Sequence, residues 1–459
     1  MIRHFKPMKP TLRTILLITA VLLAATLIYF RVTNTPQQDI AIDIVTLAAN
    51  RRIGVYGPVG LQFDRPMDQA SVENHISFTP KTSGRFEWVQ NTLWFYPDEP
   101  IDPSQDFTLS LRSGAKSAEG EKLNKSLDVS LSIRPTEVLY LVLDQTGGDL
   151  WRWDFTAQTA TPLTDTGGTI IDFAPNRIGE AIVYSAENVE GGSDLWVTDR
   201  EAQTNTLIIE CGLDYCSQPA WSADSALIAY ARQSRNTTTG LLQSPQIWLY
   251  NTESLEAHPL YPDEDIKGEL PSFSPEGQRL AFYNLDQSAI QILNLEASQE
   301  TLIPTDVEGM GDWSPDGSQM LFTDLVPSAL EPEEAIYIAD LEDRSVRRAL
   351  EESSEGTVFS QPRVSPDGDW IAVSLRPVNS TGSKALWVLE LDGDEITLIA
   401  NEPAETYTSY FWSPSGYRLI YQSLDTSNAS FPSAIWLWHW GRSESELIVE
   451  NAARPVWLP

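Results

Sequence analysis

The chain has 459 residues, 42% of them hydrophobic, with 15 Trp, 15 Tyr and 15 Phe, and this composition excludes overall disorder. The length suits two or three domains, or one repeat array with a smaller domain beside it. Because 31 Lys and Arg stand against 64 Asp and Glu, the formal net charge is -33, which repels phosphate backbones and argues against a nucleic-acid partner.

The first predicted element is an uncharged apolar run from Thr14 to Phe30, which Leu12 and Val32 can extend. As a helix this run would rise about 25 Å, at the short end for a bilayer span. Four basic residues precede it: Arg3, Lys6, Lys9 and Arg13. Only Arg31 follows it closely, so the positive-inside rule predicts a cytoplasmic basic tail over 1–13, a transmembrane signal anchor over 14–32 and all later residues outside the cytoplasm.

A cleaved signal peptide is the alternative for this segment, because Ala20, Ala24 and Ala25 are small residues. The apolar run TLIYF follows them and leaves no polar approach to a cleavage site, which favours an uncleaved anchor. Since no cysteine lies near the segment, a lipoprotein anchor is excluded.

Residues 40–134 are predicted to form short β-strands, separated by turn residues at intervals typical of a sandwich. Two runs in this region carry a resemblance, through Phe63, Pro66, Met67, Asp68, Ser71 and Val72 in the first and Leu93, Phe95, Pro97, Pro103 and Phe107 in the second. The two runs resemble the bacterial Ig-like domains of S-layer and other cell-surface proteins. The resemblance implies a spacer or adhesion module, a kind of domain that rarely carries catalysis.

From Val138 onward the chain repeats one element: PSFSPEGQRLAFYN, GDWSPDGSQMLFTD, PRVSPDGDWIAVSL and YFWSPSGYRLIYQS. Ser at the first position of the turn, Pro at the second and Gly at the fourth favour a type I turn. Aligning the copies on this turn places seven residues at equivalent positions: Phe173, Trp221, Phe273, Trp313, Val364, Trp412 and Trp457. Two copies depart from the pattern, because Ser222 to Ser225 lacks Pro and Gly, and the run from Phe173 lacks the Ser and has its glycine late, at Gly179.

A second series of strands supports the repeat, and its equivalent residues are Trp151, Trp196, Trp248, Gln291, Tyr337, Trp387 and Trp436. The repeats resemble the TolB-type, WD-like β-propeller repeat. The array begins with later strands of a repeat at Val138 and ends with a first strand, ARPVWLP, so the two ends are expected to complete one unit. The fold class predicted for the chain is therefore all-β, with a seven-bladed propeller over 138–459 closed by the strand 453–459; six blades are the alternative.

The chain has two cysteines, Cys211 and Cys216, which are predicted to form a disulfide in an oxidising compartment. A metal site would need further ligands, and the sequence places none nearby. The expected disulfide is therefore a local structural link.

The sequence offers little for catalysis, and no catalytic, cofactor-binding or metal-binding residue is assigned. A nucleophile elbow needs G-x-S-x-G, which does not occur. Beyond the apolar segment the histidines are His75, His258 and His439. The seven-bladed pectin-fragment lyases, which resemble this repeat, hold a divalent metal through several histidines, and His258 and His439 do not reproduce that set. His439 is expected to be a packed or rim residue.

Acidic residues give one alternative, a calcium site. Asp316 and Asp367 are assigned to the turns, since Glu276 and Ser415 stand at the equivalent positions. The segments 261–269 and 391–395 could bind Ca²⁺ through carboxylates and carbonyls, but neither matches the twelve-residue calcium loop, so solvated hairpin tips are expected. No cofactor is expected.

Two insertions between strands, 232–246 and 325–335, are candidate recognition loops. The sequence thus predicts a monomeric, membrane-anchored, extracytoplasmic binding or scaffold protein, with a protein or an envelope polysaccharide as partner. A carbohydrate- or peptide-acting enzyme and a structural surface component are the alternatives. The residues that bind the ligand are not identified by the sequence.

Overall fold

The protein is all-β over the residues that its structure, a computed structural model, describes. These residues are 40–44, 52–54, 59–97, 101, 106–134, 137–143, 148–177, 179–262, 265–326, 333–350, 357–358, 361–377, 382–393, 395–428, 430 and 432–458. Within these ranges, no helix has the length and apolar character needed to cross a bilayer. The anchor predicted over 14–32 lies outside them.

The N-terminal domain is a two-layer β-sandwich. Its elements are β1 (Ile42–Ile44), β2 (Arg52–Gly54), β3 (Val59–Phe63), α2 (Gln69–Glu73), β4 (Ile76–Thr79), β5 (Gly84–Val89), β6 (Thr92–Pro97), β7 (Phe107–Leu111) and β8 (Leu127–Arg134). One sheet has the order β1-β3-β6-β5 and the other β2-β8-β7-β4. Leu61 and Leu93 of the first sheet share one buried cluster with Leu109 and Leu131 of the second, so the core lies between the sheets.

The motif around Met67 has a local structural role in this sandwich. Met67 is buried, and the Asp68 carboxylate accepts a hydrogen bond from the backbone N–H of Ser71 at 3.0 Å, which caps the N-terminus of α2. Met67 therefore contributes to the core, and Asp68 stabilises the start of α2.

The rest of the described chain is a β-propeller built from antiparallel units of four strand positions. The strands of the first three units are β9 (Glu137–Leu143), β10 (Gly148–Asp154), β11 (Thr159–Pro162), β12 (Ile170–Pro175), β13 (Ala181–Glu187), β14 (Ser193–Asp199), β15 (Asn205–Ile209), β16 (Tyr215–Trp221), β17 (Leu227–Gln233), β18 (Gln246–Asn251) and β19 (Glu256–Pro259), together with the C-terminal β37 (Ala452–Leu458). They form the units β37-β9-β10-β11, β12-β13-β14-β15 and β16-β17-β18-β19.

Four further units follow along the chain. Their strands are β20 (Gly268–Phe273), β21 (Arg279–Asn284), β22 (Ala289–Asn294), β23 (Glu300–Pro304), β24 (Asp312–Trp313), β25 (Gln319–Leu325), β26 (Glu334–Asp340), β27 (Val346–Arg348), β28 (Thr357–Val358), β29 (Arg363–Val364), β30 (Trp370–Pro377), β31 (Ala385–Glu390), β32 (Ile396–Ala400), β33 (Glu405–Trp412), β34 (Arg418–Asp425), β35 (Ser433–His439) and β36 (Glu446–Glu450). In the third of these four units, β28 and β29 both pair with β30 and share the first position. First strands of neighbouring units contact one another, as β16 does with β12 and β20, so they surround the axis.

The second sequence series lies on the third strands of the units. Trp196 pairs with Tyr184, Trp248 with Tyr230 and Trp436 with Tyr421, each across the second and third strands of its unit. This repeated register is the structural basis of the periodicity in the sequence.

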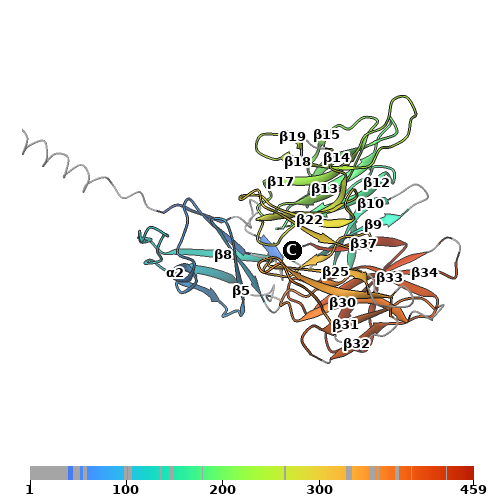
Figure 1. Cartoon of the computed structure of the whole chain (residues 1–459). Helices are drawn as coiled ribbons and strands as arrows, with labels where there is room; N and C mark the ends of the chain where they lie inside the picture. Colours follow the sequence, from blue (N-terminus) through green and yellow to red (C-terminus); the bar gives the residue numbers. More distant parts are fainter. Residues whose placement is uncertain are drawn as a thin grey trace, which may run out of the picture.

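The C-terminal strand β37 pairs antiparallel with β9 (Figure 1). This pairing was predicted because the repeat array begins with later strands of a unit and ends with a first strand. Trp457 lies opposite Val138 and is buried, and its indole N–H donates to the carbonyl of Phe411 at 3.0 Å. The two ends of the repeat array therefore complete one unit.

The predicted alignment of the first copy is wrong by two residues. Pro175 pairs with Ile182 as Trp221 pairs with Ile228, so Pro175, and not Phe173, stands at the position of the aromatic series. Asn176 takes the place of the serine, and Gly179 is then the ordinary fourth residue of its turn. Phe173 is buried two residues earlier on β12.

Serine replaces glycine in the turn of the next unit without changing its geometry. The N–H of Ser225 donates to the carbonyl of Ser222 at 2.9 Å, as the N–H of Gly317 does to Ser314. Ser225 adopts φ +61°, close to the +69° of Gly317, so a residue with a side chain accepts the left-handed conformation here.

Cys211 and Cys216 are joined by the disulfide that the sequence predicts. Cys211 lies just before β16 and Cys216 is its second residue. The bond therefore closes the small loop that leads into an inner strand of the propeller.

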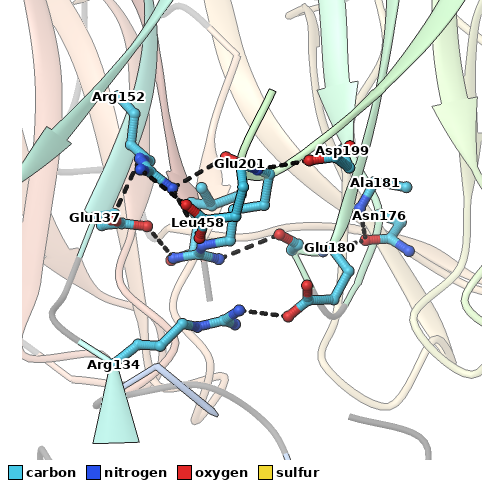
Figure 2. Close-up of polar contacts among 11 residues, drawn as sticks. Arg134, Glu137, Arg152, Asn176, Glu180, Ala181, Asp199, Glu201 and Leu458 are labelled. Carbon is cyan, nitrogen blue, oxygen red and sulfur yellow. Dashed lines mark hydrogen bonds and ion pairs between the residues drawn. The ribbon is translucent and has the colours of Figure 1, made fainter. Parts of the chain in front are cut away.

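Buried charged residues join the sandwich, the first propeller strand and the closing strand (Figure 2). Arg134, at the end of β8, is paired with Glu180 in the turn between β12 and β13. Arg200 is 1% exposed; it is paired with Glu137 and donates to the carbonyls of Gly179 at 3.2 Å and Leu458 at 3.5 Å. We refer to Arg134, Glu137, Arg152, Glu180 and Arg200 as the closure network.

Candidate functional site

The three histidines that the sequence analysis considered lie apart from one another. His75 follows α2 in the sandwich, where its Nδ1 lies 2.6 Å from the carbonyl oxygen of Ser71. His258 is exposed on β19, and His439 ends β35. Burial, followed by the nearby charges of Arg418 and Arg442, lowers the pKa of His439. These positions do not form a common site.

The acidic residues considered as calcium ligands have other partners where they are described. The Asp316 carboxylate accepts from the Ser314 hydroxyl at 2.6 Å and the Ser318 N–H at 3.0 Å. Burial works to raise the pKa of Asp316, but these hydrogen bonds hold it below its ordinary value. Among the described residues, no group of His, Cys, Asp and Glu is arranged to hold a metal ion.

The inner strands carry ion pairs between neighbouring units. Arg454 of β37 lies 2.7 Å from Asp172 of β12, and Arg363 of β29 lies 3.3 Å from Asp312 of β24. Burial raises the pKa of Asp312, and the Arg363 charge opposes the shift. These pairs link first strands around the axis.

The sandwich packs against the turns that follow the first strands of the propeller. Arg177 is the centre of this contact: it is paired with Glu87, donates to the Pro275 carbonyl at 2.6 Å, and lies over the rings of Trp94 and Tyr96 at 5.6 and 4.8 Å. Burial lowers the pKa of Arg177, and the Glu87 carboxylate opposes this effect. One face of the propeller is thereby fixed to the sandwich.

A groove of about 290 Å³ lies along this contact, between the sandwich and the units of β29–β32 and β33–β36. The sandwich contributes Arg85, Tyr96 and Pro97. The propeller contributes Pro366, Asp367, Trp370, Pro414, Ser415, Gly416, Tyr417 and Trp440. Sites for small ligands occur preferentially at such domain junctions.

Aromatic rings form the propeller wall of the groove. Trp370 and Trp440 meet edge to face with their centroids 4.6 Å apart, and Trp438 lies 5.5 Å behind Trp440. Trp440 is 37% exposed and Tyr417 is 49% exposed, although the three tryptophans are in contact. Large apolar rings that remain this accessible on a packed support are typical of binding sites.

Polar groups stand at the edges of the groove. The Arg85 guanidinium lies over the ring of Tyr96 at 4.7 Å. The exposed Asp367 carboxylate accepts from the Ser365 hydroxyl and from the Asp369 N–H at 3.2 Å, so it is held in position by its own turn. The Ser415 hydroxyl lies 3.1 Å from that of Ser413. The groove thus offers a cation, an anion and a hydroxyl beside stacking surfaces.

The repeated turns position this wall. A Cβ at Gly416 would lie 3.6 Å from Pro366, and a Cβ at Gly368 would lie 3.5 Å from Pro315, so each turn packs against the turn before it. The N–H of Trp440 donates to the Tyr417 carbonyl at 2.9 Å, which ties the two exposed rings to one backbone contact. The groove is therefore built on the propeller's most regular element.

From the sequence, Asp367 was assigned to a turn and no other groove residue was considered as a ligand contact, but one signal was available. Tyr417 follows the turn glycine at a position where other copies have Gln278, Ser318 and Asp369. A large aromatic residue at a polar turn position is the departure that marks the site. The contribution of Arg85 and Tyr96 has no such signal, because it depends on how the two domains meet.

Comparison with known proteins supports the fold and does not extend to a family. No family model matches the chain, and no curated protein matches it. The chain is similar in structure to an oligogalacturonate lyase in complex with manganese, at 12% identity over 88% of this chain and 97% of that one, with a TM-score of 0.51. It is also similar to an oligogalacturonate lyase from Vibrio parahaemolyticus, at 13% identity over 67% and 92% of the two chains, again with a TM-score of 0.51.

A third solved structure, TolB from Acinetobacter baumannii, aligns at 20% identity over 70% of this chain and 82% of that one, with a TM-score of 0.43. At these identities the two lyase structures show a shared fold alone. The chain is a β-propeller protein, and this fold by itself does not determine its chemistry.

Proposed function

We propose that this chain is a membrane-anchored, extracytoplasmic binding protein that holds an envelope glycan in the groove between sandwich and propeller. The observation that carries the proposal is the exposure of Trp440 and Tyr417 on a wall of packed tryptophans, opposite Arg85 and Tyr96. The proposal also includes the architecture: the propeller is a seven-bladed ring, and the sandwich is an Ig-like domain that acts as its spacer.

A glycan fits the chemistry of this groove better than a purely apolar ligand. Sugar rings present C–H faces that pack on aromatic rings, while their hydroxyls need donors and acceptors. The groove supplies both through Trp440, Arg85 and Asp367. Its volume of about 290 Å³ is at the small end for ligand sites, which suits one or two sugar units of a longer chain.

The test is binding of the full-length protein, in detergent, to isolated peptidoglycan sacculi and to immobilised envelope polysaccharides. Tyr417→Ala and Trp440→Ala are each expected to weaken binding by roughly tenfold or more, because Trp and Tyr side chains dominate such contacts. Tyr417→Phe, which keeps the ring, is the matched control and should bind nearly as wild type. Equal binding by wild type, Tyr417→Ala and Trp440→Ala would contradict the proposal.

The proposal includes no catalytic step. A bound polysaccharide should be recovered with its chain length unchanged after prolonged incubation, as measured by mass spectrometry. Shortened products would instead support the alternative of a carbohydrate-acting enzyme. The same measurement with Asp367→Asn would show whether this groove is responsible.

The location is a separate part of the proposal, and it rests on the charge asymmetry around residues 14–30. A reporter enzyme that is active only outside the cytoplasm, fused after Pro459, is expected to be active in intact cells. A reporter that works only in the cytoplasm should be inactive at the same position. The reverse pattern would contradict an anchor with its N-terminus in the cytoplasm.

A further inference from the structure

Four aliphatic side chains are exposed on three neighbouring loops of the propeller. Val189, between β13 and β14, is fully exposed at 106%, and Leu213, between β15 and β16, is 49% exposed. Leu241 and Leu242, in the insertion between β17 and β18, are 70% and 39% exposed. We refer to residues 188–192, 210–215 and 234–243 as the loop surface.

The loop surface lies away from the sandwich. Strand β16 begins at Tyr215, within the loop surface, and its far end leads to Ala223, which packs with Val89 and Trp94 of the sandwich. A strand of this length spans about 20 Å. In Figure 1 the sandwich, labelled β5 and β8, lies to one side of the propeller. A partner on the loop surface would therefore leave the groove accessible.

One arginine joins the three loops. The guanidinium of Arg235 donates to the carbonyls of Gly191 at 2.9 Å, Leu213 at 3.1 Å and Gly240 at 2.8 Å, one carbonyl from each loop. The same group lies 5.7 Å from the ring centroid of Tyr215. Arg235 therefore brings the backbones of the three loops that carry the exposed aliphatic residues together.

Further contacts fix the backbone of the loop surface. The Asp214 carboxylate accepts from Arg232 at 2.9 and 3.0 Å and from the Arg235 N–H at 2.9 Å. The side-chain amide of Asn188 donates to the Gly212 carbonyl at 2.8 Å, and the disulfide Cys211–Cys216 spans the loop that carries Leu213. Preorganised loops lose little conformational entropy on binding, so exposed aliphatic groups here serve association better than they would on free loops.

The charge around the loop surface selects the kind of partner. Arg232 and Arg235 are directed to Asp214 and to backbone carbonyls, whereas Glu187, Glu190 and Glu210 are exposed. The rim is therefore acidic, in a chain with a formal net charge of -33. An anionic lipid surface or a second copy of this chain would be repelled, and a basic surface would be attracted.

We propose that the loop surface is a docking site for a second protein, one whose apolar pocket is bordered by Lys and Arg residues. Val189, Leu213 and Leu241 enter the pocket, and the exposed glutamates face its basic border. This inference stands apart from the proposed glycan groove, since it uses other loops and another face of the propeller.

The test places a photoreactive amino acid at position 241 of the full-length protein in its native envelope. The control carries the same probe at Leu255, which is 69% exposed on the turn between β18 and β19 and so matches Leu241 in accessibility. A cross-link from position 241 and not from 255, to one protein with a basic surface, is the expected result. Cross-links only to lipid or to this chain, or none at all, would overturn the proposal.

The captured protein is then purified and titrated with the full-length chain. Leu213→Ser with Leu241→Ser should weaken its binding at least tenfold, Leu255→Ser should leave it unchanged, and added salt should slow association. Equal affinity for the double variant and wild type would overturn the assignment of the loop surface. Because the substituted side chains are exposed, circular dichroism should show the same fold in all variants.

Discussion

Truncation of the chain after Asn451 is expected to abolish soluble expression, or to lower the melting temperature sharply. The deletion removes β37, whose pairing with β9 completes a unit of the propeller. It also removes Trp457, which is 6% exposed and stacks on Phe155 with centroids 5.7 Å apart. Loss of the buried aromatic alone costs roughly 3 kcal/mol or more, and the exposed edge of β9 adds a risk of aggregation.

The single substitution Trp457→Ala separates the packing effect from loss of the strand, and thermal unfolding followed by circular dichroism measures both. A chain that begins after residue 135 is the control. It should keep a folded propeller, because the core of the sandwich is separate from that of the propeller. Removing the sandwich takes away Glu87, but it also exposes Arg177 to water, so no buried charge is left without a partner there. If the chain truncated after Asn451 has the melting temperature of the wild type, β37 does not close the ring.

The propeller could be predicted because each unit repeats the same physical requirements. A turn with Ser, Pro and Gly leads from the first strand to the second, and the second and third strands keep one register, so errors in single copies are averaged out. The alignment of the first copy was wrong because Phe173 was chosen for its aromatic side chain, although the turn itself places Pro175 at that position. The side chain of Asn176 accepts hydrogen bonds from the N–H groups of Glu180 and Ala181 at 3.0 and 3.1 Å. It therefore replaces the serine hydroxyl that accepts the equivalent hydrogen bond in other copies, such as that of Ser222 from Leu227.

The candidate site could not be predicted in the same way. Arg85 and Trp440 are far apart in the chain, and they border one groove only because Arg177 and its neighbours fix the sandwich on the propeller. The sequence also does not show which side chains are exposed. Leu241 and Leu249 are both leucines near one insertion, yet the first is 70% exposed and the second 7%. Periodicity predicts what is buried within a unit, whereas binding surfaces arise where units and domains meet.

Replacement of a buried arginine in the closure network is expected to have the second large effect. In Arg200→Met the Glu137 carboxylate, which is 7% exposed, keeps Arg152 at 3.3 Å but loses its buried partner, and the carbonyls of Gly179 and Leu458 lose a donor. Burial lowers the pKa of Arg200 to about 10, so the wild-type side chain is still charged at neutral pH. Removing one partner of such a pair costs about 3–5 kcal/mol.

Thermal and urea unfolding of the full-length chain should show this loss as a fall of roughly 5 °C or more in melting temperature. Lys267→Met, which breaks an ion pair with the 80% exposed Asp265, is the control and should change stability by less than about 1 kcal/mol. Adding Glu137→Leu to Arg200→Met should recover part of the loss, because the buried carboxylate is then removed as well. If Arg200→Met is no more destabilising than Lys267→Met, Arg200 does not hold β9 and β37 to the turn before β13.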